Sequence, residues 1–232
     1  MDPLTDKYPG ISPYAYCMWN PVKLIDPDGT SIDVSKIYER KKDGSYKYEY
    51  LVKAFEFFAN TEYGRNELAK YAKAGQEIAG HVFKNDGEYH NKNIDISFEA
   101  PTVSTHHTGD TKIEKKGERL NINIVVGNIS EVGTVLESLC HETFIHGYQT
   151  TKDFIDDGNF TNHSQLSPEM RAWNVSPAQQ EHGQDARHNK RMLNEAVPIL
   201  KKYYSSIGVP RTNAQIIKQI NSGMGHYNNI DQ

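Results

Sequence analysis

Residues 141–146, His-Glu-Thr-Phe-Ile-His, combine two imidazoles and a carboxylate at a spacing close to that of zinc hydrolases. Such enzymes carry His-Glu-x-x-His on a helix, where both histidines hold the metal and the glutamate activates a water. Here one extra residue separates the histidines. In a regular α-helix, residues five apart point about 140° apart, against about 40° for residues four apart. His141 and His146 can therefore share an ion only if the helix is locally irregular.

A single π-type turn would supply this irregularity, because one extra residue in a turn returns positions five apart to the same side of the helix. Gly147, directly after the second histidine, would help the backbone to adjust. The pattern His-Glu-x-x-x-His is similar to the motif of dipeptidyl peptidase III. The sequence thus predicts a π turn at a zinc site, with Glu142 as the general base that takes a proton from water.

A third ligand is expected from a second helix, which begins with a capping serine and a proline at 176–177. His182 lies on the apolar stripe of that helix, at steps of three and four residues, so it should face the core. His188 is six residues further on, about 240° around the helix, and should face solvent. Glu181 is the next candidate after His182. The predicted metal ligands are His141, His146 and His182.

Other residues near the motif have ordinary structural explanations. Glu137 could pair with the first histidine as a ligand, but a supporting or solvated carboxylate is the main expectation. Tyr148 could stabilise an oxyanion, although simple packing suits a chain with 14 tyrosines. Cys140 is expected to be a small core side chain. The pair at 106–107, His-His, is expected in a solvated loop, and a chance motif on a surface helix remains an alternative in a chain with ten histidines.

The remaining sequence predicts the elements that must position the motif. Alternating apolar residues indicate half-buried strands, and apolar residues every three or four positions indicate helices. Before the motif we expect a hairpin over 39–50 with a type I′ turn at Asp43-Gly44, and helices over 50–59 and 61–74, the second capped by Thr61. We then expect strands over 94–98 and 120–126, and a helix capped by Ser130 that leads into the motif. After the motif we expect a helix from 176 toward 204, kinked near Pro198. The strand over 120–126 is expected to be the edge along which an extended peptide binds.

Composition excludes several classes of protein. The 232 residues carry a net charge of −4, so the clustered positive field of a nucleic-acid-binding protein is not expected. No apolar run approaches the roughly 18 residues that span a bilayer, and the first residues lack the features of a signal peptide, so neither a membrane partner nor classical export is predicted. Two cysteines are too few for a disulfide framework.

Residues 1–30 are dense in turn-forming dipeptides and are not expected to fold alone. They contain Asp-Pro-Leu-x-x-Lys-Tyr-Pro, then Ser-Pro-Tyr-x-Tyr-Cys, and end with Asn-Pro-x-x-x-x-Asp-Pro-x-Gly. This text resembles the end of the core region of RHS-repeat proteins, in which the repeats form a hollow shell, Asp-Pro motifs carry an aspartyl self-cleavage, and a variable toxin follows. The resemblance implies that Asp2 and Asp26 occupy the self-cleavage positions and that 31–232 is the toxin domain.

These patterns together predict an α+β, zincin-like fold, with a small mixed sheet packed against a metal-binding helix and a C-terminal helix. Glu-His-x-x-x-Ala at 181–186 also resembles an element of zinc toxin domains attached to RHS-like proteins. The expected protein is a zinc metallopeptidase toxin delivered into a competing cell by a contact-dependent system. Its expected partners are a protein or peptide substrate, a cognate immunity protein and the RHS shell. The alternatives are a nuclease toxin that uses His106, His107 and His163 with a divalent metal, and an inactive zincin-like binding domain.

Overall fold

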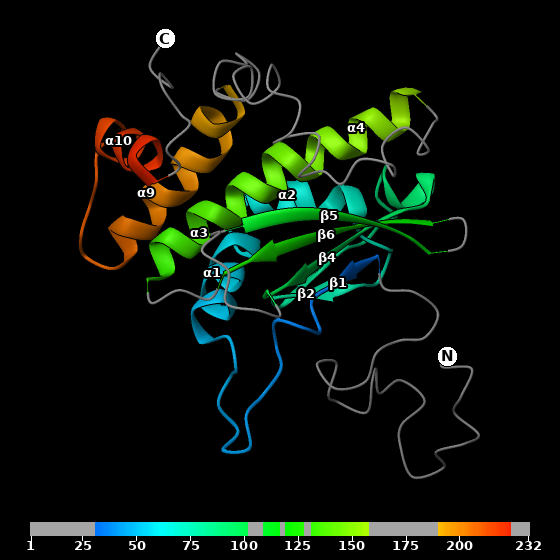
Figure 1. The fold of residues 1–232 in the computed structure, drawn as a ribbon, viewed down its shortest axis with the longest axis horizontal. Helices are drawn as coiled ribbons and strands as arrows, with labels where there is room; N and C mark the ends of the chain where they lie inside the picture. Colours follow the sequence, from blue (N-terminus) through cyan, green and yellow to red (C-terminus); the bar gives the residue numbers. More distant parts are fainter. Residues whose placement is uncertain (1–30, 102–108, 117–118, 128–130, 158–189, 224–232) are drawn as a thin grey trace.

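A computed structural model describes residues 31–101, 109–116, 119–127, 131–157 and 190–223. One apolar core joins these ranges, with buried side chains from Ile32 near the start to Ile220 near the end. The architecture is α+β, a small mixed sheet covered by helices (Figure 1), which confirms the predicted fold class at this level. None of the helices in the described ranges is long and apolar enough to cross a membrane.

The main sheet has four strands in the order β1-β4-β6-β5. Its strands are β1 (Ile32–Asp33), β4 (Ile94–Glu99), β5 (Gly109–Lys116) and β6 (Arg119–Val126). The first three strands in spatial order are parallel, and β5 joins antiparallel to β6. A separate antiparallel pair is formed by β2 (Glu77–Ile78) and β3 (His81–Val82).

The predicted strands over 94–98 and 120–126 are confirmed, because their alternating apolar residues form one buried face. The expectation that 120–126 forms an edge is wrong, since β6 pairs with β4 on one side and β5 on the other. The edge beside β6 is β5, a strand rich in lysine and acidic residues. Charged residues are typical of edge strands because they discourage pairing with other chains.

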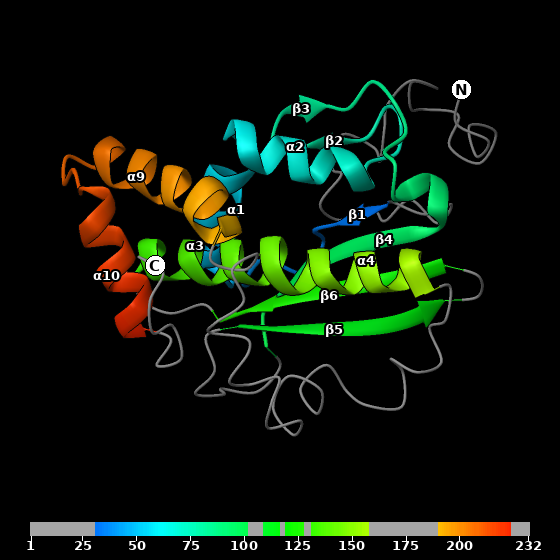
Figure 2. The same cartoon turned by 90° about the horizontal axis from the view of Figure 1, so that it is seen from above.

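Nine helical segments are described. In chain order they are α1 (Glu49–Ala59), α2 (Glu62–Tyr71), the 3-10 turn η3 (His90–Lys92), α3 (Val132–His141), the π turn η4 (Glu142–Gly147), α4 (Tyr148–Asp157), the π turn η5 (Met192–Ala196), α9 (Val197–Ser206) and α10 (Asn213–Gly223). The segments α3, η4 and α4 run on as one long helix across the sheet (Figure 1, Figure 2).

Aromatic packing joins this long helix and α1 to the buried face of the sheet. The ring of Phe55 on α1 lies with its centroid 4.8 Å from that of Phe98 on β4. One turn along α1, Phe58 lies 5.6 Å from Phe144 of the π turn. Burial of such rings is the main favourable term in a core of this size. The π turn is therefore embedded in the core and not on a frayed surface helix.

Helix boundaries agree with the sequence to within a few residues. Thr61 caps α2 as predicted, because its Oγ1 accepts the backbone N–H of Gly64 at 3.0 Å, but the helix ends at Tyr71 rather than at 74. The long helix begins at Val132 with Glu131 in the capping position, and the predicted cap Ser130 lies outside the described residues.

Of the helix predicted from 176 toward 204, the part before 190 lies outside the described residues. The helix is present from 190 to 206, and its irregularity is the π turn η5, which ends two residues before Pro198. Proline has no N–H to donate and collides with the carbonyl four residues back. A wide turn at that point relieves both problems.

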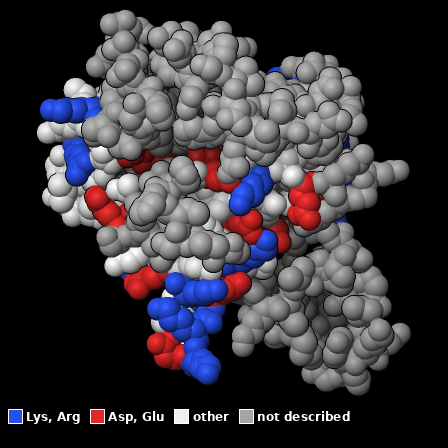
Figure 3. Space-filling model, in the orientation of Figure 1, with Lys and Arg blue, Asp and Glu red and all other residues white. Residues whose placement is uncertain are grey.

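The hairpin predicted over 39–50 is shorter, because α1 begins at Glu49 and the two arms are joined by a single antiparallel bridge between Arg40 and Tyr46. It projects from the rest of the fold (Figure 1), and on the face drawn in Figure 3 its lysine and arginine side chains gather together with acidic ones. The type I′ turn predicted at its tip is wrong, because that turn needs two central residues with positive φ and only Gly44, at 85°, has it. Asp43 instead accepts hydrogen bonds from the backbone N–H and the hydroxyl of Ser45. These bonds favour an Asx-type turn.

Candidate metal centre

The motif lies on a π turn, as its spacing predicted. Residues Glu142–Gly147 form η4, and the backbone N–H of Tyr148 is shared between the carbonyls of Ile145 and of Thr143, which is five residues back. A bond to the fifth preceding residue defines a π turn and absorbs the extra residue of the motif. The π turn therefore brings positions 141 and 146 to the same side of the helix, as the spacing of the motif requires.

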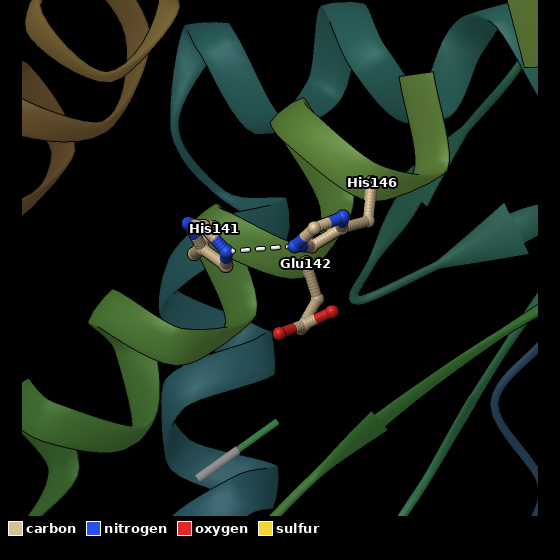
Figure 4. Close-up of side chains that lie close together, drawn as sticks. All are labelled: His141, Glu142 and His146. Atoms are coloured by element: carbon tan, nitrogen blue, oxygen red, sulfur yellow. Dashed lines mark hydrogen bonds between the residues drawn. The ribbon is translucent and has the colours of Figure 1, made fainter. Parts of the chain in front are cut away.

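The two histidine rings meet on one side of this turn (Figure 4). His141 Nε2 lies 2.9 Å from His146 Nε2, and the ring planes are 74° apart. His141 is only 5 % exposed, and His146 is half-buried. Two imidazole nitrogens that bind one tetrahedral zinc at about 2.0–2.1 Å would be roughly 3.3 Å apart. The donor pair thus fits a zinc ion after a separation of a few tenths of an ångström.

Glu142 extends from the same turn but is held by the edge strand β5. Thr111 Oγ1 donates a hydrogen bond of 2.8 Å to Glu142 Oε2, and both side chains are buried. Gly109 lies so close that a Cβ there would be 2.6 Å from Glu142 Oε1. Burial raises the pKa of the Glu142 carboxyl to about 8, and the hydrogen bond from Thr111 opposes that rise.

Sequence reasoning did not single out Gly109 or Thr111. The alternation of Thr111, Ile113 and Lys115 carried a strand signal, but with one apolar residue it was too weak to notice.

Other side chains on the long helix have structural roles. Cys140 is fully buried, and burial raises the pKa of its thiol, so it is the core side chain that the sequence indicated. Glu137 is also buried and accepts a hydrogen bond of 2.6 Å from Gln219 Nε2 on α10. The ring of Tyr148 lies under the guanidinium of Arg191, 3.7 Å from its carbon, which agrees with a packing role.

Within the described ranges, His141, Glu142 and His146 form the group of three side chains able to hold a metal, with ligand atoms within 4.8 Å of one another. Several predicted functional residues lie outside those ranges, so their positions stay predictions. They are the third ligand His182, its alternatives Glu181 and His188, the nuclease candidates His106, His107 and His163, and the self-cleavage residues Asp2 and Asp26.

Comparisons of the chain with protein-family models, with curated protein sequences and with solved structures found no match. What the site does is therefore inferred from its own geometry.

Proposed function

We propose that the chain is a zinc-dependent hydrolase of the metallopeptidase type. His141 and His146 are its ligands from the π turn, His182 is its third ligand, and Glu142 is its general base. The observation that carries this proposal is the convergence of the two Nε2 atoms to 2.9 Å beside a buried glutamate. Three imidazoles with one open position are the ligand set of several catalytic zinc sites.

Zinc, when bound, supplies Lewis acidity that polarises a carbonyl and makes water acidic near neutral pH. The remaining work falls to the chain. Glu142 takes a proton from the attacking water and returns it to the leaving amine, which is ordinary general acid-base chemistry. Thr111 holds one oxygen of Glu142, so the other oxygen is available for the proton. A nearby dication would also favour the ionised carboxylate that a base requires.

The proposal extends to fold family and biological setting. The mixed sheet, the metal-binding helix and the C-terminal helices support a zincin-like fold for 31–232. The sequence of residues 1–30 supports the proposal that this domain is the toxin of an RHS-repeat protein, delivered into a competing cell. Its substrate would be a protein or peptide, and a cognate immunity protein would be its partner.

Zinc binding and hydrolysis can be tested separately. The purified chain should hold one zinc after equilibrium dialysis, and His146→Ala should lose it because only one of the two ligands on the long helix remains. Glu142→Gln should keep the metal but cleave a peptide library, followed by mass spectrometry, about 10²- to 10⁴-fold more slowly. His81→Ala, which removes an exposed histidine on β3, is the matched control and should behave as wild type.

Two results would overturn the proposal: a wild-type chain without zinc, or Glu142→Gln with full activity. Stoichiometric zinc with no cleavage of any peptide would favour the inactive binding domain.

A further inference from the structure

We infer that Arg191 is a positioning residue for the metal site: it holds the π turn of the metal-binding helix by fixing the ring of Tyr148. This inference rests on the proposed zinc site and adds a residue that touches neither the metal nor the substrate. It concerns the region where η5 packs against η4.

Arg191 lies across the ring that follows the π turn. Its guanidinium carbon is 3.7 Å from the centroid of the Tyr148 ring and 5.9 Å from that of Phe144. The first distance is that of a stacked cation over an aromatic face, a contact that strengthens when it is desolvated. The Arg191 side chain is 17 % exposed, so little water competes for it.

Two carboxylates fix the guanidinium in this position. Nη2 of Arg191 lies 2.8 Å from Glu195 Oε2 and 3.4 Å from Glu67 Oε2. Glu67 on α2 is 2 % exposed and also pairs with Lys70 at 2.6 Å, so it cannot easily move away. Arg191 therefore joins α2 and η5 to the metal-binding helix.

Tyr148 transmits this constraint to the histidines through its backbone. Its N–H makes the hydrogen bond to Thr143 O that defines the π turn. If the helix relaxed to regular α geometry at this point, His146 would rotate by about 100° away from His141. Fixing the Tyr148 ring keeps its backbone in the π register, and thereby keeps the two Nε2 atoms on one side.

The test measures zinc affinity by competition with a chromogenic chelator, together with the visible spectrum of the cobalt-substituted chain. Arg191→Met and Tyr148→Leu should weaken zinc binding about 10-fold, as substitutions behind a metal ligand commonly do. Arg191→Lys should also weaken it, because an ammonium keeps the charge for the two carboxylates but has no plane to stack. All three altered chains and wild type are compared at a temperature where circular dichroism shows all of them folded.

Matched controls separate this role from general destabilisation. Tyr148→Phe keeps the ring, and Lys190→Ala removes an exposed neighbouring cation, so both should bind zinc as wild type does. The cobalt spectrum should change in Tyr148→Leu and stay unchanged in Tyr148→Phe. If Arg191→Met does not fold, Arg191→Lys and Tyr148→Leu carry the test.

Wild-type affinity in Arg191→Lys and Tyr148→Leu would overturn the inference and leave the zinc site standing. A wild-type chain that binds no zinc would overturn the proposed function as well, so the two failures are distinguishable.

Discussion

The carboxylate of Glu142 is positioned by contacts from a strand and not by its own helix. A Cβ added at Gly109 would lie 2.6 Å from its Oε1, closer than real Cβ contacts. Gly109→Ala should therefore displace the base while both histidines stay in place. We expect peptide cleavage to fall at least about 10-fold, a fraction of what loss of the general base costs, with zinc content unchanged.

Thr111 offers a matched pair for this prediction. Thr111→Ser keeps the hydroxyl that donates to Glu142 and should stay close to wild type, whereas Thr111→Val removes it. Full activity in both Gly109→Ala and Thr111→Val, measured with the same peptide library, would show that β5 does not position the base.

Glu137 makes stability depend on pH. Burial raises the pKa of its carboxyl from an ordinary 4.5 to about 7, although the hydrogen bond from Gln219 opposes the rise. The folded chain thus binds this proton more tightly than the unfolded chain. Its contribution to stability is complete below pH 4.5 and is lost as pH rises to 7, by up to about 3 kcal/mol.

The side-chain amide in Glu137→Gln resembles the protonated carboxyl of Glu137, so this variant should not lose stability as pH rises. In urea unfolding, the free energy of unfolding of wild type relative to that of Glu137→Gln should be about 2–3 kcal/mol lower at pH 8 than at pH 5. A stability difference between the two chains that is equal at both pH values would contradict the assignment.

At the scale of elements, the sequence predicted the strands and helices whose apolar residues recur at regular spacing. The strands around Ile96 and Ile122 and the helices α1 and α2 follow from repeating apolar positions. The strand β5 was not predicted, because Thr111 and Ile113 alternate with charged residues and leave too few apolar positions for a pattern.

The candidate site was predictable only in part. The π turn followed from a chemical requirement, since two histidines five apart can meet in no other helical geometry. The partnership of Arg191 with Tyr148 could not be predicted, because it joins residues 43 positions apart in sequence through a fold that no local pattern specifies. The role of His182 stays a prediction.

Close packing between α3 and α9 provides a test of the frame that supports the site. A Cβ at Gly133 would lie 2.5 Å from the Tyr204 hydroxyl. In a helix, replacing glycine by alanine normally stabilises the fold by roughly 1 kcal/mol. The clash at Gly133 should instead make this substitution destabilising. Gly133→Ala should destabilise the chain by about 1–3 kcal/mol in thermal or urea unfolding.

Tyr204→Phe removes the clashing hydroxyl and provides the control. In a double-mutant cycle, Gly133→Ala should cost less in the Phe background than in wild type. Equal costs in both backgrounds would show that the helices relax without using this contact.

For the whole molecule, one core with buried residues from Ile32 to Ile220 supports the site on the long helix. The long helix supplies two histidines, and the predicted third comes from a segment just before η5. Metal binding would then tie the C-terminal helices to the motif helix, in addition to the link through Arg191. The net charge of −4 does not favour the nucleic-acid alternative.

X-ray absorption at the zinc edge of the loaded chain tests the central claim most directly, because it counts the atoms around the metal. The expected result is three imidazole nitrogens and one oxygen near 2.0–2.1 Å, with His182→Ala losing one imidazole and His141→Ala abolishing stoichiometric binding. Sulfur at the metal, or a spectrum unchanged by His141→Ala, would contradict the claim that the π turn is a zinc site.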